Sequence, residues 1–122
     1  MPKYLLLLID AEIDYANVSE ADFNAEMEEH RSFARELEEL GGKSLGGEAL
    51  QPVATATFLR GTRTDGVTVV DNPAPDLKEV LGGYYLIEAA DDATARKIAE
   101  RCPAGNGYVE MRPIWEIPGS DG

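Results

Sequence analysis

The sequence contains one cysteine and one histidine among 122 residues. A single cysteine cannot form a disulfide within the chain, which is typical of proteins from a reducing compartment. A single histidine excludes a metal site built on several imidazole ligands. We therefore expect no disulfide framework, no zinc site and no bound cofactor.

Basic residues are also scarce, since 11 lysine and arginine residues stand against 23 aspartate and glutamate residues. The resulting net charge of −12 repels phosphate backbones and anionic lipid headgroups. We expect neither a nucleic acid nor a membrane among the partners of the protein.

Long apolar runs are missing as well. The run Tyr4–Ile9 is short, and Asp10 and Glu12 follow it where a signal peptide needs small residues. No segment approaches the roughly 20 apolar residues that span a bilayer. These features predict a soluble, cytoplasmic protein.

The residues that are present suit one globular domain. Hydrophobic residues make up 43% of the chain, which is enough for a core at this length. We expect a single domain over residues 1–117 and a flexible tail over residues 118–122.

The first half of the chain predicts a strand followed by a long helix. Tyr4–Ile9 is typical of a central strand, and Ser19 is a suitable N-cap for a helix over Glu20–Leu40. The glycine pair after Leu40 ends that helix. The apolar stripe of the helix is expected to comprise Phe23, Met27, Ala34 and Leu37, widened by Phe33 and Leu40.

The second half predicts a second helix among several strands. The helix should start at Asp91 or Asp92 and run through Arg101. The turn residues Thr64–Gly66 predict a hairpin between the two strands on either side. The strands expected after the first are Lys43–Leu50, Val53–Arg60, Val67–Asp71, Tyr84–Ala89 and Val109–Ile117.

This order of elements predicts an α+β fold of the ferredoxin-like kind. It contains the split βαβ pattern, an extra central hairpin, and an antiparallel sheet with both helices on one face. The other face of such a sheet is left uncovered, so we expect a homodimer that packs through it.

Several strings in the sequence resemble those of the YCII-related family, specifically its DGPF-domain proteins, over nearly the whole chain. The resemblance includes the position of His30 in the first helix. The strings that carry it are Gly46–Pro52 with Ala54–Thr57, Val70–Ala74 with Leu77–Glu79, Leu81–Leu86, and Val109–Ile114.

The resemblance implies a dimeric α/β barrel built from ferredoxin-like protomers. Most members of the family have no established activity, a few relatives in the wider superfamily are enzymes, and the genes often neighbour those of extracytoplasmic-function sigma factors. The name motif is half kept here: Asp71 and Pro73 stand, whereas Asn72 replaces glycine and Ala74 replaces phenylalanine. The loss of the aromatic ring implies a wider or refilled pocket.

His30 is the leading candidate for a catalytic residue. It lies three residues after Met27 on the helix face that is expected to meet the sheet. A buried histidine is either a core residue with a satisfied ring or a general acid or base oriented by a carboxylate. The candidate carboxylate partners are Asp71, Glu48 and Glu110, although Asp71 equally suits a turn and Glu48 a solvated strand edge.

The candidates for ligand binding are Arg112, Lys78, Tyr84 and Glu110. Arg112 could bind a carboxylate ligand through its planar guanidinium, or form a structural ion pair with Glu110 on the same strand face. Lys78 offers a second positive charge close to the name motif. Tyr84 and Tyr85 point to opposite faces of their strand, and we assign Tyr84 to the pocket.

Three functions are therefore open. The first is a small enzyme that uses His30 and a carboxylate on a small organic molecule. The second is a protein that binds such a molecule in the same pocket without turnover. The third is a dimeric interaction module, linked to a sigma factor by the resemblance, whose first helix is the docking surface because it carries eight acids and only two arginines.

Overall fold

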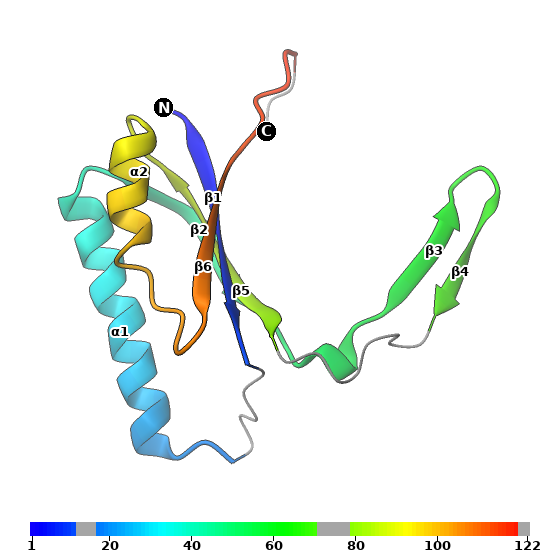
Figure 1. The fold of residues 1–122 in the computed structure, drawn as a ribbon, viewed down its shortest axis with the longest axis horizontal. Coiled ribbons are helices and arrows are strands. Elements are labelled where there is room, and N and C mark those ends of the chain that lie inside the picture. Colours follow the sequence, from blue (N-terminus) through cyan, green and yellow to red (C-terminus); the bar gives the residue numbers. More distant parts are fainter. Residues whose placement is uncertain (12–16, 71–78, 120–122) are drawn as a thin grey trace.

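The computed structural model describes residues 1–11, 17–70 and 79–119 (Figure 1). These described residues form two α-helices and six strands, together with a short 3₁₀ turn at Val53–Thr55. The elements are β1 (Lys3–Asp10), α1 (Glu20–Glu39), β2 (Lys43–Ala49), β3 (Phe58–Thr62), β4 (Gly66–Val70), β5 (Val80–Glu88), α2 (Asp92–Ala99) and β6 (Tyr108–Pro113).

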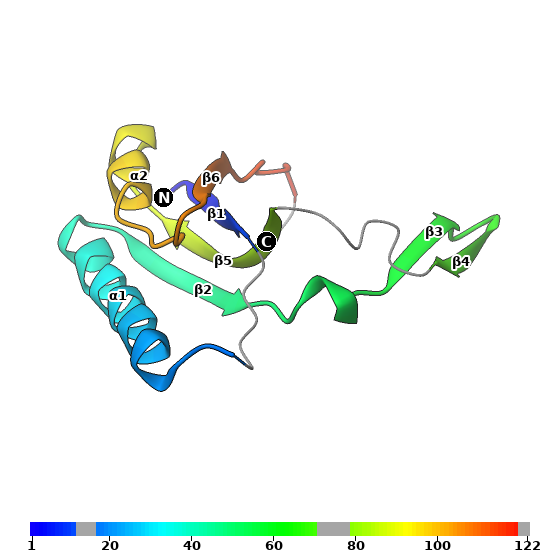
Figure 2. The same cartoon turned by 60° about the horizontal axis from the view of Figure 1, so that its bottom comes forward.

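Four strands form one antiparallel sheet in the order β2-β5-β1-β6. Both helices lie against the same face of this sheet, and the opposite face carries no helix (Figures 1 and 2). This is the strand order of a ferredoxin-like fold, so the predicted fold class is confirmed.

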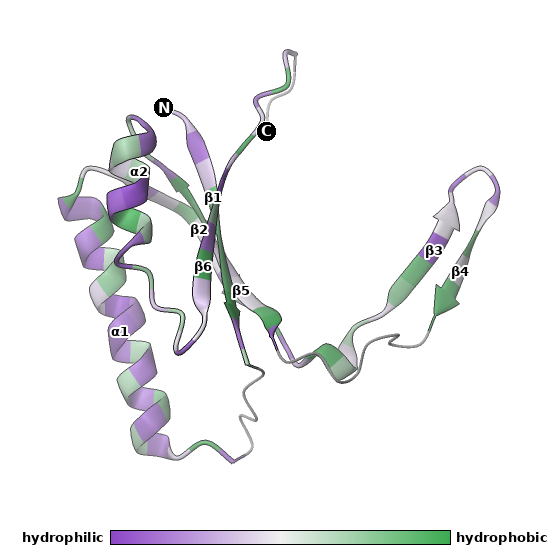
Figure 3. Ribbon diagram, in the orientation of Figure 1, coloured by the Kyte–Doolittle hydropathy of each residue, from purple (hydrophilic) through white to green (hydrophobic). Residues whose placement is uncertain are grey.

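The hydrophobic core lies between the helices and the sheet. Tyr4 and Leu6 of the central strand β1 point into it, and the two neighbouring strands supply Tyr85, Ile87, Val109 and Met111. Phe33 and Leu37 of α1 and Ile98 of α2 cover these residues. Figure 3 shows that α1 is mostly hydrophilic with scattered hydrophobic residues, which is typical of a helix that buries one face only.

Helix α1 begins where the sequence predicts, because Ser19 Oγ accepts a hydrogen bond of 3.1 Å from the backbone N–H of Asp22. The predicted buried stripe was wrong in part. Phe23 is 42% exposed, and Ala34 and Leu40 are exposed as well. The helix instead buries Phe33 and Leu37.

The buried face of α1 is therefore turned by part of a helical turn from the predicted stripe. Half-buried Glu26, Met27 and His30 continue the line of Phe33 and Leu37 toward the N-terminus of the helix. The apolar residues of α1 form two overlapping stripes along the helix, and the sheet packs only against the stripe that contains Phe33 and Leu37.

The predicted hairpin forms its own two-stranded sheet, which projects away from the body (Figures 1 and 2). Leu59, Val67 and Val69 share one face of this hairpin and are all exposed. The strand expected from Val53 starts only at Phe58, because Pro52 opens a 3₁₀ turn in which Thr55 Oγ1 donates to its carbonyl over 2.7 Å.

The ends of three further elements differ from the predictions, and for the two strands among them the reason is pairing with a neighbouring strand. Strand β5 begins at Val80 instead of Tyr84, because its pairing with β1 continues past the glycine pair, with a shift of register at Gly82. Strand β6 ends at Pro113 instead of Ile117, since its partner β1 begins at Lys3 and the ladder stops there. Helix α2 ends at Ala99, two residues before the predicted end.

Of the helices in the described ranges, none has the length and apolarity needed to cross a lipid bilayer.

Candidate functional site

The single histidine of the chain is bonded to a tyrosine of the sheet. His30 Nδ1 of α1 lies 2.5 Å from the hydroxyl oxygen of Tyr85 in β5, and both side chains are half-buried. Their ring centroids are 5.8 Å apart, with an angle of 34° between the planes. The hydrogen bond joins helix and sheet at one end of the core.

Strand alternation places Tyr85 on the helix face. Tyr85 and Ile87 both pack against the core, so the intervening Leu86 and the preceding Tyr84 belong to the other face. The ring of Tyr85 also lies against Phe33, with centroids 4.9 Å apart, one helical turn from His30. This contact fixes the tyrosine ring beneath the imidazole.

The environment of Tyr85 keeps its hydroxyl protonated. Burial, with a smaller contribution from Cys102, raises the pKa of Tyr85 to about 12. At neutral pH the phenol therefore has a proton to donate and an oxygen that can accept. Either tautomer of a neutral imidazole can form a hydrogen bond with such a group.

A cavity of about 720 Å³ opens beside this pair. Its wall comes from the N-terminal half of α1, the end of β2, the start of β5 and the loop that precedes β6. Leu8, Met27 and Leu50 supply apolar surface, and Gln51 and Asn106 supply polar groups. The volume is in the range of small-molecule sites.

Asp10 fastens one wall of the cavity. Its carboxylate accepts hydrogen bonds from the backbone N–H groups of Ala11 at 2.7 Å and Asn106 at 3.1 Å. The chain passes so close at this point that a Cβ atom on Gly107 would lie 1.8 Å from the carbonyl oxygen of Ile9. The loop from Pro103 to Asn106 is therefore held against the end of β1.

A second cavity of about 470 Å³ lies between α2 and β6 and includes Cys102. Burial raises the pKa of the Cys102 thiol to about 12. Because the thiolate is the reactive form, this cysteine is not activated as a nucleophile.

The structure separates His30 from most of the residues predicted to share its site. The register of β2, β5, β1 and β6 puts Glu48, Tyr84, Leu7 and Glu110 in one cross-strand row. Alternation assigns the side chains of this row to the open face, opposite His30. Glu48 and Tyr84 still contribute to the cavity wall where β2 meets β5.

Arg112 lies on the same open face and forms an ion pair with Glu110. The strand register therefore does not bring His30, Tyr84 and Arg112 together in one pocket between the helices and the sheet. The tyrosine that reaches the histidine is Tyr85. Asp71 and Lys78, the other two predicted site residues, lie outside the described residues.

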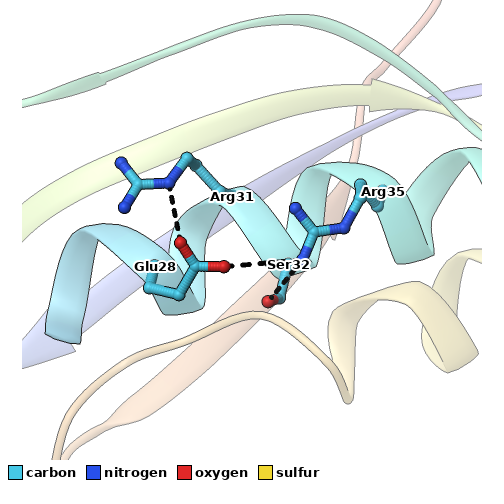
Figure 4. Close-up of polar contacts among 4 residues, drawn as sticks. All are labelled: Glu28, Arg31, Ser32 and Arg35. Atoms are coloured by element: carbon cyan, nitrogen blue, oxygen red, sulfur yellow. Dashed lines mark hydrogen bonds and ion pairs between the residues drawn. The ribbon is translucent and has the colours of Figure 1, made fainter.

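The outer face of α1 carries its own network of charges (Figure 4). Glu28 pairs with Arg31 at 2.9 Å and with Arg35 at 3.6 Å, and Arg35 also donates to Ser32 Oγ at 3.0 Å. The arginines, led by Arg31, hold the pKa of Glu28 below its usual value. Both arginines of this helix are thus occupied on its solvent side.

The sequence interpretation missed two residues of the site. Alternation puts Tyr85 on the same strand face as the strongly apolar Ile87, and this could have shown that Tyr85 rather than Tyr84 faces the core. Glu26 could have been found from its position one helical turn before His30, because residues four apart share a helix face.

Metal ligands do not gather in the described part of the chain, where no group of three or more histidine, cysteine, aspartate or glutamate side chains is placed to hold an ion.

Comparison with known proteins gives a family. No curated protein matches the sequence. The family model of the YCII-related domain matches residues 3–118, nearly the whole chain. The chain therefore belongs to the YCII-related domain family.

Proposed function

We propose that this protein is a small enzyme that moves a proton on a small organic molecule, with His30 as the group that gives and takes it. One observation carries the proposal: His30 Nδ1 lies 2.5 Å from the Tyr85 hydroxyl at the wall of a cavity of about 720 Å³. An imidazole that is fixed through one ring nitrogen can transfer a proton through the other.

Tyr85 suits this chemistry as a partner that serves both protonation states of the ring. When Nδ1–H of the neutral imidazole donates to the phenol oxygen, Nε2 carries no proton and can act as a base. Once Nε2 has taken a proton, the imidazolium keeps the same hydrogen bond through Nδ1–H, and Nε2–H can act as an acid. Because the pKa of Tyr85 is about 12, the phenol remains neutral throughout.

Tyr85 thus takes the place that a carboxylate had in the hypothesis from the sequence. A carboxylate would bring a negative charge to the ring, whereas the phenol of Tyr85 holds the ring by a hydrogen bond and is itself neutral. We assign His30 as the catalytic residue and Tyr85 as the residue that positions it.

We further propose that two copies of the chain pack through the open face of the sheet. Leu5, Leu7 and Leu86 belong to that face by alternation, and no helix covers them within one chain. A contiguous apolar patch on a sheet is typical of a protein interface. The catalytic pair lies on the opposite face, so the interface leaves the cavity accessible.

The experiment is a metabolite screen with two readouts. Thermal stabilisation is measured for the wild type, His30→Ala and Glu38→Gln, the last being a control at an exposed position of the same helix. Each metabolite that stabilises the wild type is then incubated with protein, and its conversion is followed by mass spectrometry.

We expect at least one compound that stabilises the wild type and Glu38→Gln but not His30→Ala, and that only the first two proteins convert. Stabilisation of all three proteins by every hit would contradict a site at His30. Binding that needs His30 without any conversion would favour the ligand-binding function over the enzyme.

A further inference from the structure

The charged residues that line the cavity are of one sign. In the described part of its wall no lysine or arginine is present. The acidic residues of the wall are Asp10, Asp22, Glu26 and Glu29, together with Glu48, whose side chain belongs to the open face of the sheet. A cavity with this lining has a negative potential, and narrow walls of low dielectric concentrate that potential.

Glu26 is the carboxylate placed to meet a ligand. It lies one helical turn before His30 on the face that turns toward the sheet, and it is half-buried. Among the described residues it has neither a hydrogen bond nor an ion pair, whereas Glu28 on the outer face is paired with Arg31. A carboxylate that has lost part of its hydration is stabilised by a positive partner.

The other acidic residues of the cavity differ from Glu26 in their free hydrogen-bonding capacity or in their exposure to solvent. Asp10 already accepts two backbone N–H groups, which use a large part of its hydrogen-bonding capacity. Asp22 and Glu29 are exposed where helix α1 lines the cavity. Exposed acids at the entrance attract cations and repel anions before contact is made.

The apolar part of the cavity wall suits the hydrocarbon part of a ligand. Leu8, Met27 and Leu50 line the cavity and offer no polar group. A ligand that satisfies both kinds of surface has a cationic head and a short apolar body. An inorganic cation would leave the apolar wall unused.

We infer that the substrate of the site is a small organic cation, an amine or a guanidine, whose charged nitrogen pairs with Glu26. This inference rests on the function proposed above and names its substrate class. Side chains four residues apart on a helix are neighbours, so one small molecule can contact Glu26 and His30 together.

The test uses four probes with one carbon skeleton: butylamine, butylguanidine, butanol and butyrate. Binding is followed by NMR titration of the His30 ring signals in the wild type, Glu26→Gln and Glu28→Gln. The control variant removes the same charge from the same helix, but on the outer face. His30→Ala is titrated in parallel through backbone amide signals.

We expect the two cationic probes to bind in the cavity and butanol and butyrate to bind much more weakly. Loss of a charged hydrogen bond should weaken cation binding about tenfold or more in Glu26→Gln. Glu28→Gln should bind as the wild type does.

The outcomes separate this inference from the proposed function. Stronger binding of butyrate than of butylamine, or no binding of either cation at millimolar concentration, would overturn the substrate class while leaving His30 as the proposed acid and base. Cation binding that depends on Glu26, combined with conversion of metabolites that does not depend on His30, would uphold the substrate class and refute the proposed function.

Discussion

The hydroxyl oxygen of Tyr85 lies 2.5 Å from Nδ1 of His30, the one histidine of the chain, and the pKa of this phenol is raised to about 12. Helix α1 supplies the imidazole and strand β5 supplies the phenol. The pair therefore depends on the packing of the helix on the sheet, and the same packing buries Phe33 against the tyrosine ring.

The first prediction concerns Tyr85→Phe, which removes the hydroxyl and keeps the ring. His30-dependent conversion should fall about tenfold to a hundredfold, less than the roughly 10²–10⁴-fold effect of losing an acid–base residue itself. The ¹⁵N signals of the His30 ring should show a changed mixture of tautomers. The loss of one hydrogen bond should lower the free energy of unfolding by about 1 kcal/mol.

Tyr108→Phe is the control for that variant, because it removes the same atom from an exposed tyrosine of β6 that does not line the cavity beside His30. Its His30 signals should match those of the wild type. Unchanged His30 signals in Tyr85→Phe would show that the phenol does not set the state of the ring.

The second prediction concerns alkaline pH. The pKa of Tyr85 and of Tyr4 is raised from 10.0 to about 12, by burial for Tyr85 and by the hydrogen bond to Asp92 for Tyr4. A pKa that is higher in the folded state stabilises the fold fully below the unfolded value, and this contribution is lost as the pH rises through the folded value. The free energy of unfolding should therefore fall between about pH 10 and pH 12.

Chemical denaturation at a series of pH values measures this loss. Replacement of Tyr85 with phenylalanine should flatten the decline over that range, whereas replacement of the exposed Tyr108 should leave it unchanged. A decline that is equally steep in both variants would assign the alkaline loss to other groups.

The fold could be predicted to the extent that local signals decide it. Ser19 and the glycines after Leu40 fixed the ends of α1, since caps depend on residues within one turn. The ends of β3 and β6 could not be read in the same way. Strand β6 stops where its partner begins, at Lys3, which lies more than a hundred residues away.

The candidate site shows the same division. His30 was found because it is the one titratable ring on an otherwise apolar helix face. The sequence led us to expect a carboxylate as its partner and Tyr84 in the pocket, because a choice between Tyr84 and Tyr85 depends on which side of β5 meets the helices. The orientation of Glu26 depends likewise on the rotation of α1 about its axis, which packing on the sheet decides.

The third prediction concerns the proposed dimer. Light scattering at micromolar concentration should give twice the 13.2 kDa mass of the chain. Leu5→Glu places a charge beside Leu86 on the open face and should shift the protein to the monomer, because an unpaired buried charge is costly. Leu40→Glu, at an exposed position after α1, should remain dimeric. A wild-type mass near that of one chain would exclude the dimer.

The fourth prediction concerns the two glycines that approach the end of β1. A Cβ atom on Gly107 would meet the carbonyl oxygen of Ile9 at 1.8 Å, so Gly107→Ala must push the loop away from β1. Overpacking of this kind costs about 1–3 kcal/mol, which denaturant unfolding can measure. The movement should also weaken the hydrogen bond between Asn106 and Asp10, and amide exchange at Asn106 should quicken.

Gly82→Ala is the control, because its added Cβ would lie 4.0 Å from the Leu8 carbonyl oxygen, an ordinary contact. Its backbone does not require a positive φ, so alanine should be neutral or should stabilise the fold by up to about 1 kcal/mol. Ligand binding should weaken in Gly107→Ala, because this change displaces the neighbouring loop residues Pro103 to Asn106, which line the cavity. Equal stability of the two variants would show that the loop before β6 yields freely and does not shape the cavity.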